Sequence, residues 1–155
     1  MIKGKCILTI VLIICLIFII FYFIYLSRLD TQYAIDFANV FRNYNIDDID
    51  QYFSDDTLIL CNGKKEYYKE VRKNVIKVCE SKQYQFKNGS SYGYSEDKIL
   101  NNIINIKIYL HGELKGKSFG DCLINMKLKR TKLFDFKIVS VECNEPIFEY
   151  LFFNN

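Results

Sequence analysis

The feature that most constrains this chain is an uninterrupted apolar run near its N-terminus. From Cys6 to Leu26 only Thr9 is clearly polar, and no residue is charged. As a helix, these 21 residues span about 30 Å, which is the thickness of the hydrocarbon core of a bilayer. The run lacks the polar stripe that a core helix of a small domain shows. It therefore predicts a transmembrane helix over residues 6–26.

Two kinds of secretion signal compete with a retained anchor. A cleaved signal peptide has an apolar region of about 7–15 residues and a small-residue cleavage site. This run is longer, and no such site follows it. A lipoprotein signal needs a small residue before the modified cysteine, but bulky Ile14 precedes Cys15. We therefore favour a single-pass anchor that remains in the chain.

The flanking charges predict the orientation of this anchor. Lys3 and Lys5 precede the apolar run, and Arg28 is the only cation directly after it. Because positive charge stays on the cytoplasmic side of a membrane, we expect residues 1–5 to be cytoplasmic. Residues 27–155 are then an extracellular domain at the cell membrane.

The charge of the outer part argues against a nucleic-acid binder. The net charge of +3 comes entirely from Lys3, Lys5 and Arg28, so the remainder carries 18 basic and 18 acidic residues. A nucleic-acid binder concentrates basic residues on one face. Acids gather in residues 30–56 and lysines in residues 64–137. This asymmetry fits a two-faced surface for a partner or two solvated faces.

Hydrophobic periodicity divides the outer part into helices followed by strands. Helical spacing predicts helices over residues 31–44, 45–53 and 65–82, and Asp30 or Thr31 is expected to cap the first. A strand and an Asn-Gly turn are expected between the second and third helices. Helices gathered before a run of antiparallel strands indicate an α+β domain with its helices on one face of the sheet.

Alternating apolar residues predict the strands after the third helix. The clearest are residues 100–114 and 119–130, which each place four large apolar side chains on one face. In residues 134–143 the alternation changes phase, which predicts a bulge near Ile138. The apolar tail, residues 146–155, is expected to be a last strand or turn that packs on the core.

The segments "YNIDDIDQYFSDDTLIL", "NGKKEYYKEVRKNV" and "FDFKIVSVECNEPIFEYLF" together resemble the nuclear transport factor 2-like superfamily, which includes SnoaL-like and ketosteroid isomerase-like proteins. The resemblance covers about residues 31–150. It implies a cone-shaped, cystatin-like fold of about three helices on a curved antiparallel sheet, with a pocket between them. It does not imply catalysis, because this fold serves enzymes, binding modules and assembly subunits.

No residue of the sequence matches a catalytic motif of that superfamily. Its isomerases use a pocket carboxylate as a base. Glu113 and Asp121 flank a predicted turn and are expected at the rim, whereas Asp135 and Glu142 are expected to point outward. His111, the only histidine, is expected to face solvent. We therefore predict no catalytic residue and no enzymatic activity.

Metal and cofactor sites are not predicted either. Five acids lie close together, at positions 47, 48, 50, 55 and 56. They lack the alternating spacing, central glycine and terminal glutamate of a calcium-binding EF-hand loop, and helix capping and a turn explain them better. One histidine and no Cys-x-x-Cys leave a zinc site almost without ligands.

Two cysteines are candidates for a disulfide. If residues 119–130 and 134–143 form a hairpin that turns near residues 131–132, Cys122 and Cys143 face each other within a one-residue shift. An extracytoplasmic location would allow a disulfide between them. The alternative is a pair of buried thiols that act as small apolar groups.

The predicted function is a membrane-anchored, extracytoplasmic, non-enzymatic binding module. It is expected to bind a protein partner or a small apolar ligand in the cone, besides the bilayer. Six aromatic residues are candidates either for a pocket lining or for core packing: Tyr67, Tyr68, Tyr84, Phe86, Tyr92 and Tyr94. The alternatives are a small isomerase- or dehydratase-like enzyme and an assembly subunit, since bitopic subunits of type IV secretion and conjugation machines share this topology.

Overall fold

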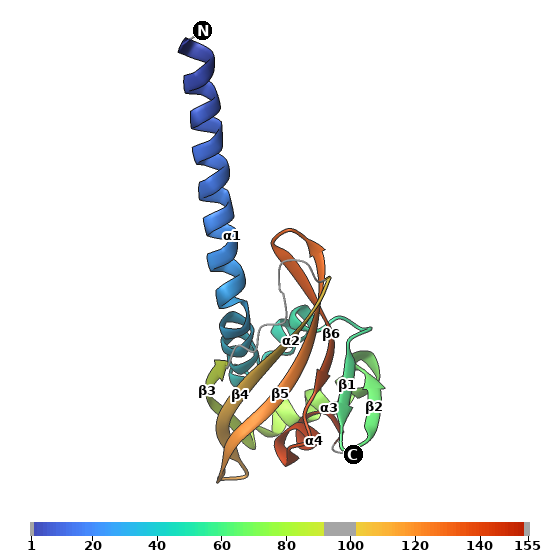
Figure 1. Ribbon diagram of the computed structural model, residues 1–155. Coiled ribbons are helices and arrows are strands. Elements are labelled where there is room, and N and C mark those ends of the chain that lie inside the picture. The colour runs from blue at the N-terminus through green and yellow to red at the C-terminus, as the bar shows by residue number, and fades with distance from the viewer. Residues whose placement is uncertain (1, 92–101, 154–155) are drawn as a thin grey trace.

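The computed structural model describes residues 2–91 and 102–153 as an α+β protein (Figure 1). The helices are α1 (Ile2–Arg42), α2 (Ile46–Tyr52), α3 (Tyr68–Ser81) and α4 (Pro146–Phe153). The strands are β1 (Leu58–Cys61), β2 (Lys64–Tyr67), β3 (Tyr84–Ser91), β4 (Ile103–Leu114), β5 (Lys117–Lys132) and β6 (Asp135–Glu142). The predicted fold class is confirmed.

Helix α1 joins the apolar segment and the domain without a break. It is 41 residues long and contains one span long and apolar enough to cross a membrane, Ile7–Leu29, whose most apolar part is not buried. Figure 1 shows this part leaving the folded body as a rod. The predicted cap at Asp30 or Thr31 is wrong, because no glycine or proline interrupts the helix there.

The six strands form one sheet in the order β2-β1-β6-β5-β4-β3. All pairs are antiparallel except β1 with β6. Strand β2 is a correction, since residues 65–67 were expected to begin the third helix. The Asn62–Gly63 turn, with both residues at positive φ, folds Lys64–Tyr67 back onto β1. Helix α3 then begins at Tyr68.

The predicted bulge near Ile138 is confirmed. Lys127 pairs with Ser140 and Leu128 pairs with Ile138, so Val139 is the extra residue. This shift lets Ile138 and Val141 both face the core although they are three positions apart.

The core lies between the concave face of the sheet and the helices. It contains the predicted faces of α3, β4 and β5. Eight aromatic side chains in it are almost fully buried: Phe37, Phe41, Phe53, Tyr68, Tyr84, Phe86, Phe148 and Phe152. The C-terminal tail is a helix and not the predicted strand or turn. Its buried residues are 147, 148, 151 and 152. This spacing places them on one face of a helix, whereas in a strand they would point to both faces.

Candidate functional site

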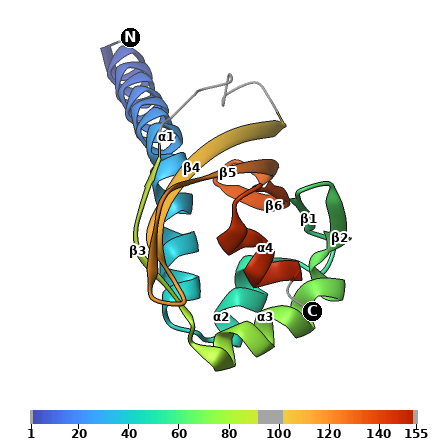
Figure 2. The same cartoon turned by 90° about the horizontal axis from the view of Figure 1, so that it is seen from below.

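The concave face of the sheet is filled by the C-terminal helix. Seen from below, α4 lies inside the ring formed by the curved sheet and helices α1 to α3 (Figure 2). Phe152 is fully buried, and its ring centroid lies 5.9 Å from that of Phe41 and 6.0 Å from that of Phe53. An apolar ligand at the centre of the cone would therefore have to displace α4.

The aromatic residues considered for a pocket lining have different positions. Tyr68, Tyr84 and Phe86 are buried in the core, and Tyr67 is exposed on β2. The Tyr84 hydroxyl donates to the carbonyl of Phe41 at 2.9 Å. These three buried residues therefore pack the core. Tyr92 and Tyr94 lie outside the described residues.

The carboxylates considered for catalysis do not gather in the cone. Glu113 forms an ion pair with Lys87 of the neighbouring strand. Asp135 is exposed and accepts a hydrogen bond of 2.6 Å from the Thr131 hydroxyl, and Glu142 is also exposed. The side chain of Asp121 lies outside what the structure describes. Among the described residues no carboxylate is buried.

The single histidine and the acidic run also have surface positions. His111 is half-buried on β4. In α2 the side chain of Asn45 accepts a hydrogen bond from the backbone of Asp47 at 3.0 Å, which caps the helix. Asp47 and Asp48 lie in its first turn, where the helix dipole favours negative charge. In the described ranges no three potential ligands form a metal-binding group.

The structure brings the two predicted cysteines together. The Sγ atoms of Cys122 and Cys143 lie 3.3 Å apart, both in the core. They are free thiols here, so the disulfide remains a prediction. The hydrogen bond to Cys143, together with burial, raises the pKa of Cys122, and burial raises that of Cys61 to about 11. A thiol that stays protonated at neutral pH is a poor nucleophile, which argues against a catalytic role for Cys122 and Cys61.

The largest feature that sequence reasoning missed is a groove between α1, α2 and the hairpin of β5 and β6. Two adjoining hollows of about 410 Å³ and about 560 Å³ share Tyr33, Asp36, Asp135 and Phe136. We call them together the juxtamembrane groove, because the first also contacts Tyr25 and Leu29 at the end of the apolar span.

Tyrosine hydroxyl groups fix the walls of this groove. Tyr25 donates to the carbonyl of Phe134 at 3.0 Å, and Tyr33 donates to that of Phe136 at 2.9 Å. The hydroxyl of Tyr52 on α2 donates to the carbonyl of Tyr33 at 3.1 Å. Burial raises the pKa of Tyr33 and of Tyr52, so both remain neutral donors.

Carboxylates and cations both line the groove, among them Asp36, Asp50, Arg28 and Lys137. Asp36 accepts a hydrogen bond of 2.8 Å from Gln32 on the same helix. Arg72 of α3 binds Asp50 through two nitrogen atoms, at 2.8 and 2.6 Å, and the Tyr68 hydroxyl adds a third contact at 2.8 Å. These hydrogen bonds, that from Arg72 first, lower the pKa of Asp50. Asp50 is therefore a carboxylate at neutral pH.

Comparison with known proteins identifies the fold. No family model matches the sequence, and no curated relative aligns with it. A solved NTF2-like protein from Cytophaga hutchinsonii matches with a TM-score of 0.55 and 11% identity, over 76% of this chain and 96% of that chain. Two proteins of Nostoc punctiforme described as having a cystatin-like fold match with TM-scores of 0.56 and 0.53, at 11% and 10% identity. They cover 76% and 75% of this chain, and 74% and 88% of their own.

The chain has the nuclear transport factor 2-like fold. This confirms the resemblance seen in the sequence. At such low identity the likeness concerns the fold alone, and both Nostoc punctiforme proteins are themselves described as of unknown function. The function has to be argued from this chain's own surfaces.

Proposed function

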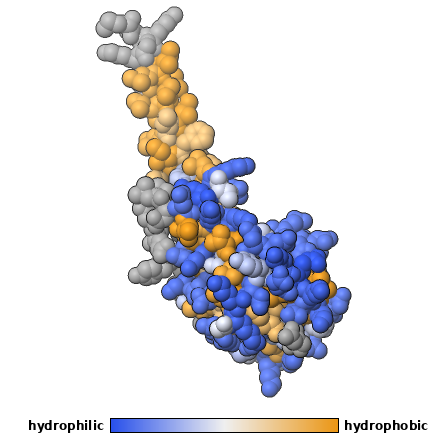
Figure 3. Space-filling model, turned by 90° about the vertical axis from the view of Figure 1, so that its right-hand side faces the viewer, coloured by the Kyte–Doolittle hydropathy of each residue, from blue (hydrophilic) through white to orange (hydrophobic). Residues whose placement is uncertain are grey.

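We propose that this chain is a single-pass membrane protein whose extracytoplasmic domain is a non-enzymatic module that binds a protein partner. One observation carries the proposal. A single unbroken helix connects an apolar span, Ile7–Leu29, whose most apolar part is not buried, to a domain whose concave face is occupied by its own helix α4. In the space-filling view the span is hydrophobic along its visible face, whereas the body is mainly hydrophilic (Figure 3).

The juxtamembrane groove supports a protein partner over a small ligand. Apolar Leu29 and Phe136 line it together with the carboxylates of Asp36 and Asp50. The cations Arg28 and Lys137 also line it, and Asp50 is paired with Arg72. This mixed lining suits a peptide segment with an apolar anchor and polar or charged flanks. Because α1 is continuous, the groove stays close to the bilayer, so we expect the partner to be a membrane protein or a protein held at the membrane.

A crosslinking experiment in living cells tests this proposal. A photo-activated residue at Gln51, which is exposed and lines the groove, should yield a reproducible crosslink to one partner. The matched control is Lys73, which is also exposed but lies on α3 outside the groove. The same products from both positions, or none from Gln51, would contradict a partner site in the groove. A product within a large complex that contains an export ATPase would favour the assembly-subunit alternative.

A further inference from the structure

We propose that the tip of the β5–β6 hairpin, Leu133 and Phe134, is a second membrane contact that inserts into the outer interface of the bilayer beside α1. The inference deepens the proposed function, since it rests on the span Ile7–Leu29 being in the membrane. Leu133 and Phe134 then contact lipid acyl chains, and anionic lipid headgroups lie around the tip.

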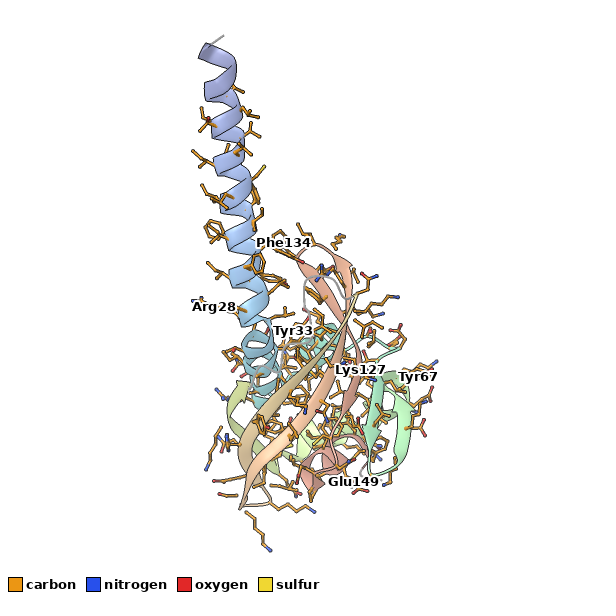
Figure 4. All side chains as sticks on the ribbon, in the orientation of Figure 1. Arg28, Tyr33, Tyr67, Lys127, Phe134 and Glu149 are labelled. Carbon is orange, nitrogen blue, oxygen red and sulfur yellow. The ribbon has the colours of Figure 1, made fainter. Side chains whose placement is uncertain are left out.

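The position of the tip along α1 is the main reason. The ring of Phe134 packs edge-on against Tyr22 and Tyr25, with centroids 5.4 Å apart in both cases. Both tyrosines belong to the apolar span. In Figure 4, Phe134 lies closer to the N-terminal end of α1 than Arg28 does. The tip of the hairpin therefore lies beyond Arg28, alongside the apolar part of α1.

The depth follows from helix geometry. Tyr22 precedes Leu29 by seven residues, or about 10 Å along the axis. The 23-residue span is about 34 Å long, against about 30 Å of hydrocarbon. With the span centred, the level midway between Tyr22 and Tyr25, where Phe134 packs, lies about 6 Å inside the hydrocarbon boundary, within the depth to which interfacial segments bury their apolar face.

The chemistry of the tip differs from that of the turn at the opposite end of the sheet. Leu133 and Phe134 are 57% and 47% exposed, and they are adjacent at the end of a hairpin. The turn between β4 and β5 carries Lys115, Gly116 and Lys117 instead. Two neighbouring large apolar side chains at a hairpin tip are unfavourable in water and favourable in the interface.

Basic side chains surround the apolar tip. Lys129 and Lys132 are exposed on β5, and the guanidinium of Arg130 lies 5.9 Å from the ring centroid of Tyr22 and 5.3 Å from that of Phe136. Long basic side chains at this level reach the headgroups while their stems cover apolar surface. Basic clusters beside a span attract anionic lipid. The acid nearest the tip, Asp135, is engaged by Thr131.

The hairpin is fixed to the helix, so two contacts set the orientation of the domain. The hydrogen bonds from Tyr25 to Phe134 and from Tyr33 to Phe136 attach the start of β6 to α1. A domain held at two points does not rotate freely about its anchor. The juxtamembrane groove lies between these points and is therefore held at the bilayer surface.

Tryptophan reporters test the inference, because the chain contains no tryptophan. The full chain is reconstituted in phosphatidylcholine vesicles with brominated acyl chains, with and without phosphatidylglycerol. The variants are Leu133→Trp at the tip, Lys115→Trp at the opposite turn and Phe18→Trp in the middle of the span. We expect blue-shifted emission and strong bromine quenching for Leu133→Trp and Phe18→Trp, and neither for Lys115→Trp. Leu133→Trp should be quenched more by bromines near the headgroup, and Phe18→Trp by deeper ones.

The outcomes separate the two proposals. If Phe18→Trp is quenched but Leu133→Trp behaves like Lys115→Trp, the anchor stands and the second contact is wrong. If Phe18→Trp is not quenched, the membrane anchor itself fails. Phe134→Trp gives an independent reading should Leu133→Trp not fold. Adding Lys129→Gln and Lys132→Gln should reduce the tip quenching only in vesicles with phosphatidylglycerol, and an equal reduction in both vesicles would contradict the anionic preference.

Discussion

The two halves of α1 share one backbone and have opposite surroundings. Between Ile7 and Phe21 the large apolar side chains are exposed on every side of the helix. Between Ala34 and Phe41 only one face is buried, with Phe37 and Phe41 fully covered, while Ile35 is 41% exposed. A helix that is apolar on every side is found in lipid or in the core of a large protein, whereas an amphipathic helix packs one face against a domain.

The comparison also shows where the exposed part of α1 ends and the packed part begins. Leu26 and Leu29 belong to the apolar span, yet each is only 3% exposed because the domain covers it. The last turns of the candidate membrane span are therefore also part of the domain core. The sequence does not distinguish a leucine that faces lipid from one that faces a protein core. The predicted end of the transmembrane helix at Leu26 therefore rested on composition alone.

The largest expected effect distinguishes the two halves by stability. Phe41→Ala should cost about 3–5 kcal/mol of the domain's unfolding free energy, because it leaves a cavity among packed aromatic rings. Phe18→Ala removes the same ring from a lipid-facing position and should leave domain stability unchanged. Denaturant unfolding in detergent micelles, followed by circular dichroism, measures both. Equal losses would mean that the span packs inside a protein core.

A second test concerns the buried thiols of the sheet. Mild oxidation should join Cys122 to Cys143, since their sulfur atoms are in contact, and lower the intact mass by about 2 Da. The bond should stabilise the domain by about 2–4 kcal/mol. Cys122→Ser should abolish the mass change, whereas Cys79→Ser, which removes a thiol beside Tyr84, should not. No mass difference between oxidised and reduced protein would end the disulfide prediction.

A smaller effect tests the junction between the two halves. Tyr25→Phe removes the hydroxyl that binds the carbonyl of Phe134 and should cost about 0.5–1.5 kcal/mol. Hydrogen exchange at the β5–β6 hairpin should rise in this variant. Tyr67→Phe, at an exposed position on β2, is the control and should change neither quantity. An unchanged hairpin in Tyr25→Phe would show that the hydroxyl does not hold it to α1.

The smallest effect is a pH dependence of domain stability. The pKa of Asp50 is lowered from its ordinary value of 3.8, so its contacts with Arg72 and Tyr68 contribute fully above that value. The contribution is lost as the pH falls through the lowered pKa. Asp50→Asn should be slightly less stable at neutral pH and show a flatter decline below about pH 4. An identical acid profile in both proteins would contradict this role.

Hydrophobic periodicity predicted much of the fold, and the predictions that were wrong have physical causes. The buried face of α3 and the core faces of β4 and β5 follow spacing that is local to each element. Strand β2 was missed because Lys65 and Glu66 favour a helix, and only the pairing of residues 64–67 with β1 makes them a strand. The continuity of α1 could have been predicted, since neither glycine nor proline lies between residues 26 and 33.

The candidate site was harder to predict than the fold. The juxtamembrane groove depends on Tyr25 meeting Phe134, which lie 109 positions apart in the chain. The pattern of residues within one segment does not predict a contact between residues so far apart in the chain. The disulfide candidates came from an expected hairpin turn near residues 131–132, which is wrong, because the turn lies at Leu133 and Phe134 and Asn125 pairs with Glu142. Cys122 and Cys143 are therefore not directly opposite each other, yet their sulfur atoms lie 3.3 Å apart.

The most direct test of the account is protease access in intact cells. A recognition sequence for a site-specific protease is inserted at the exposed turn of Lys115 and Gly116, where no atom lies within 4 Å of a Cβ added at Gly116. The account predicts complete cleavage from outside, with the N-terminal fragment, still beginning before Cys6, retained in the membrane. Cleavage only after lysis, or a mature chain that begins beyond Arg28, would contradict it.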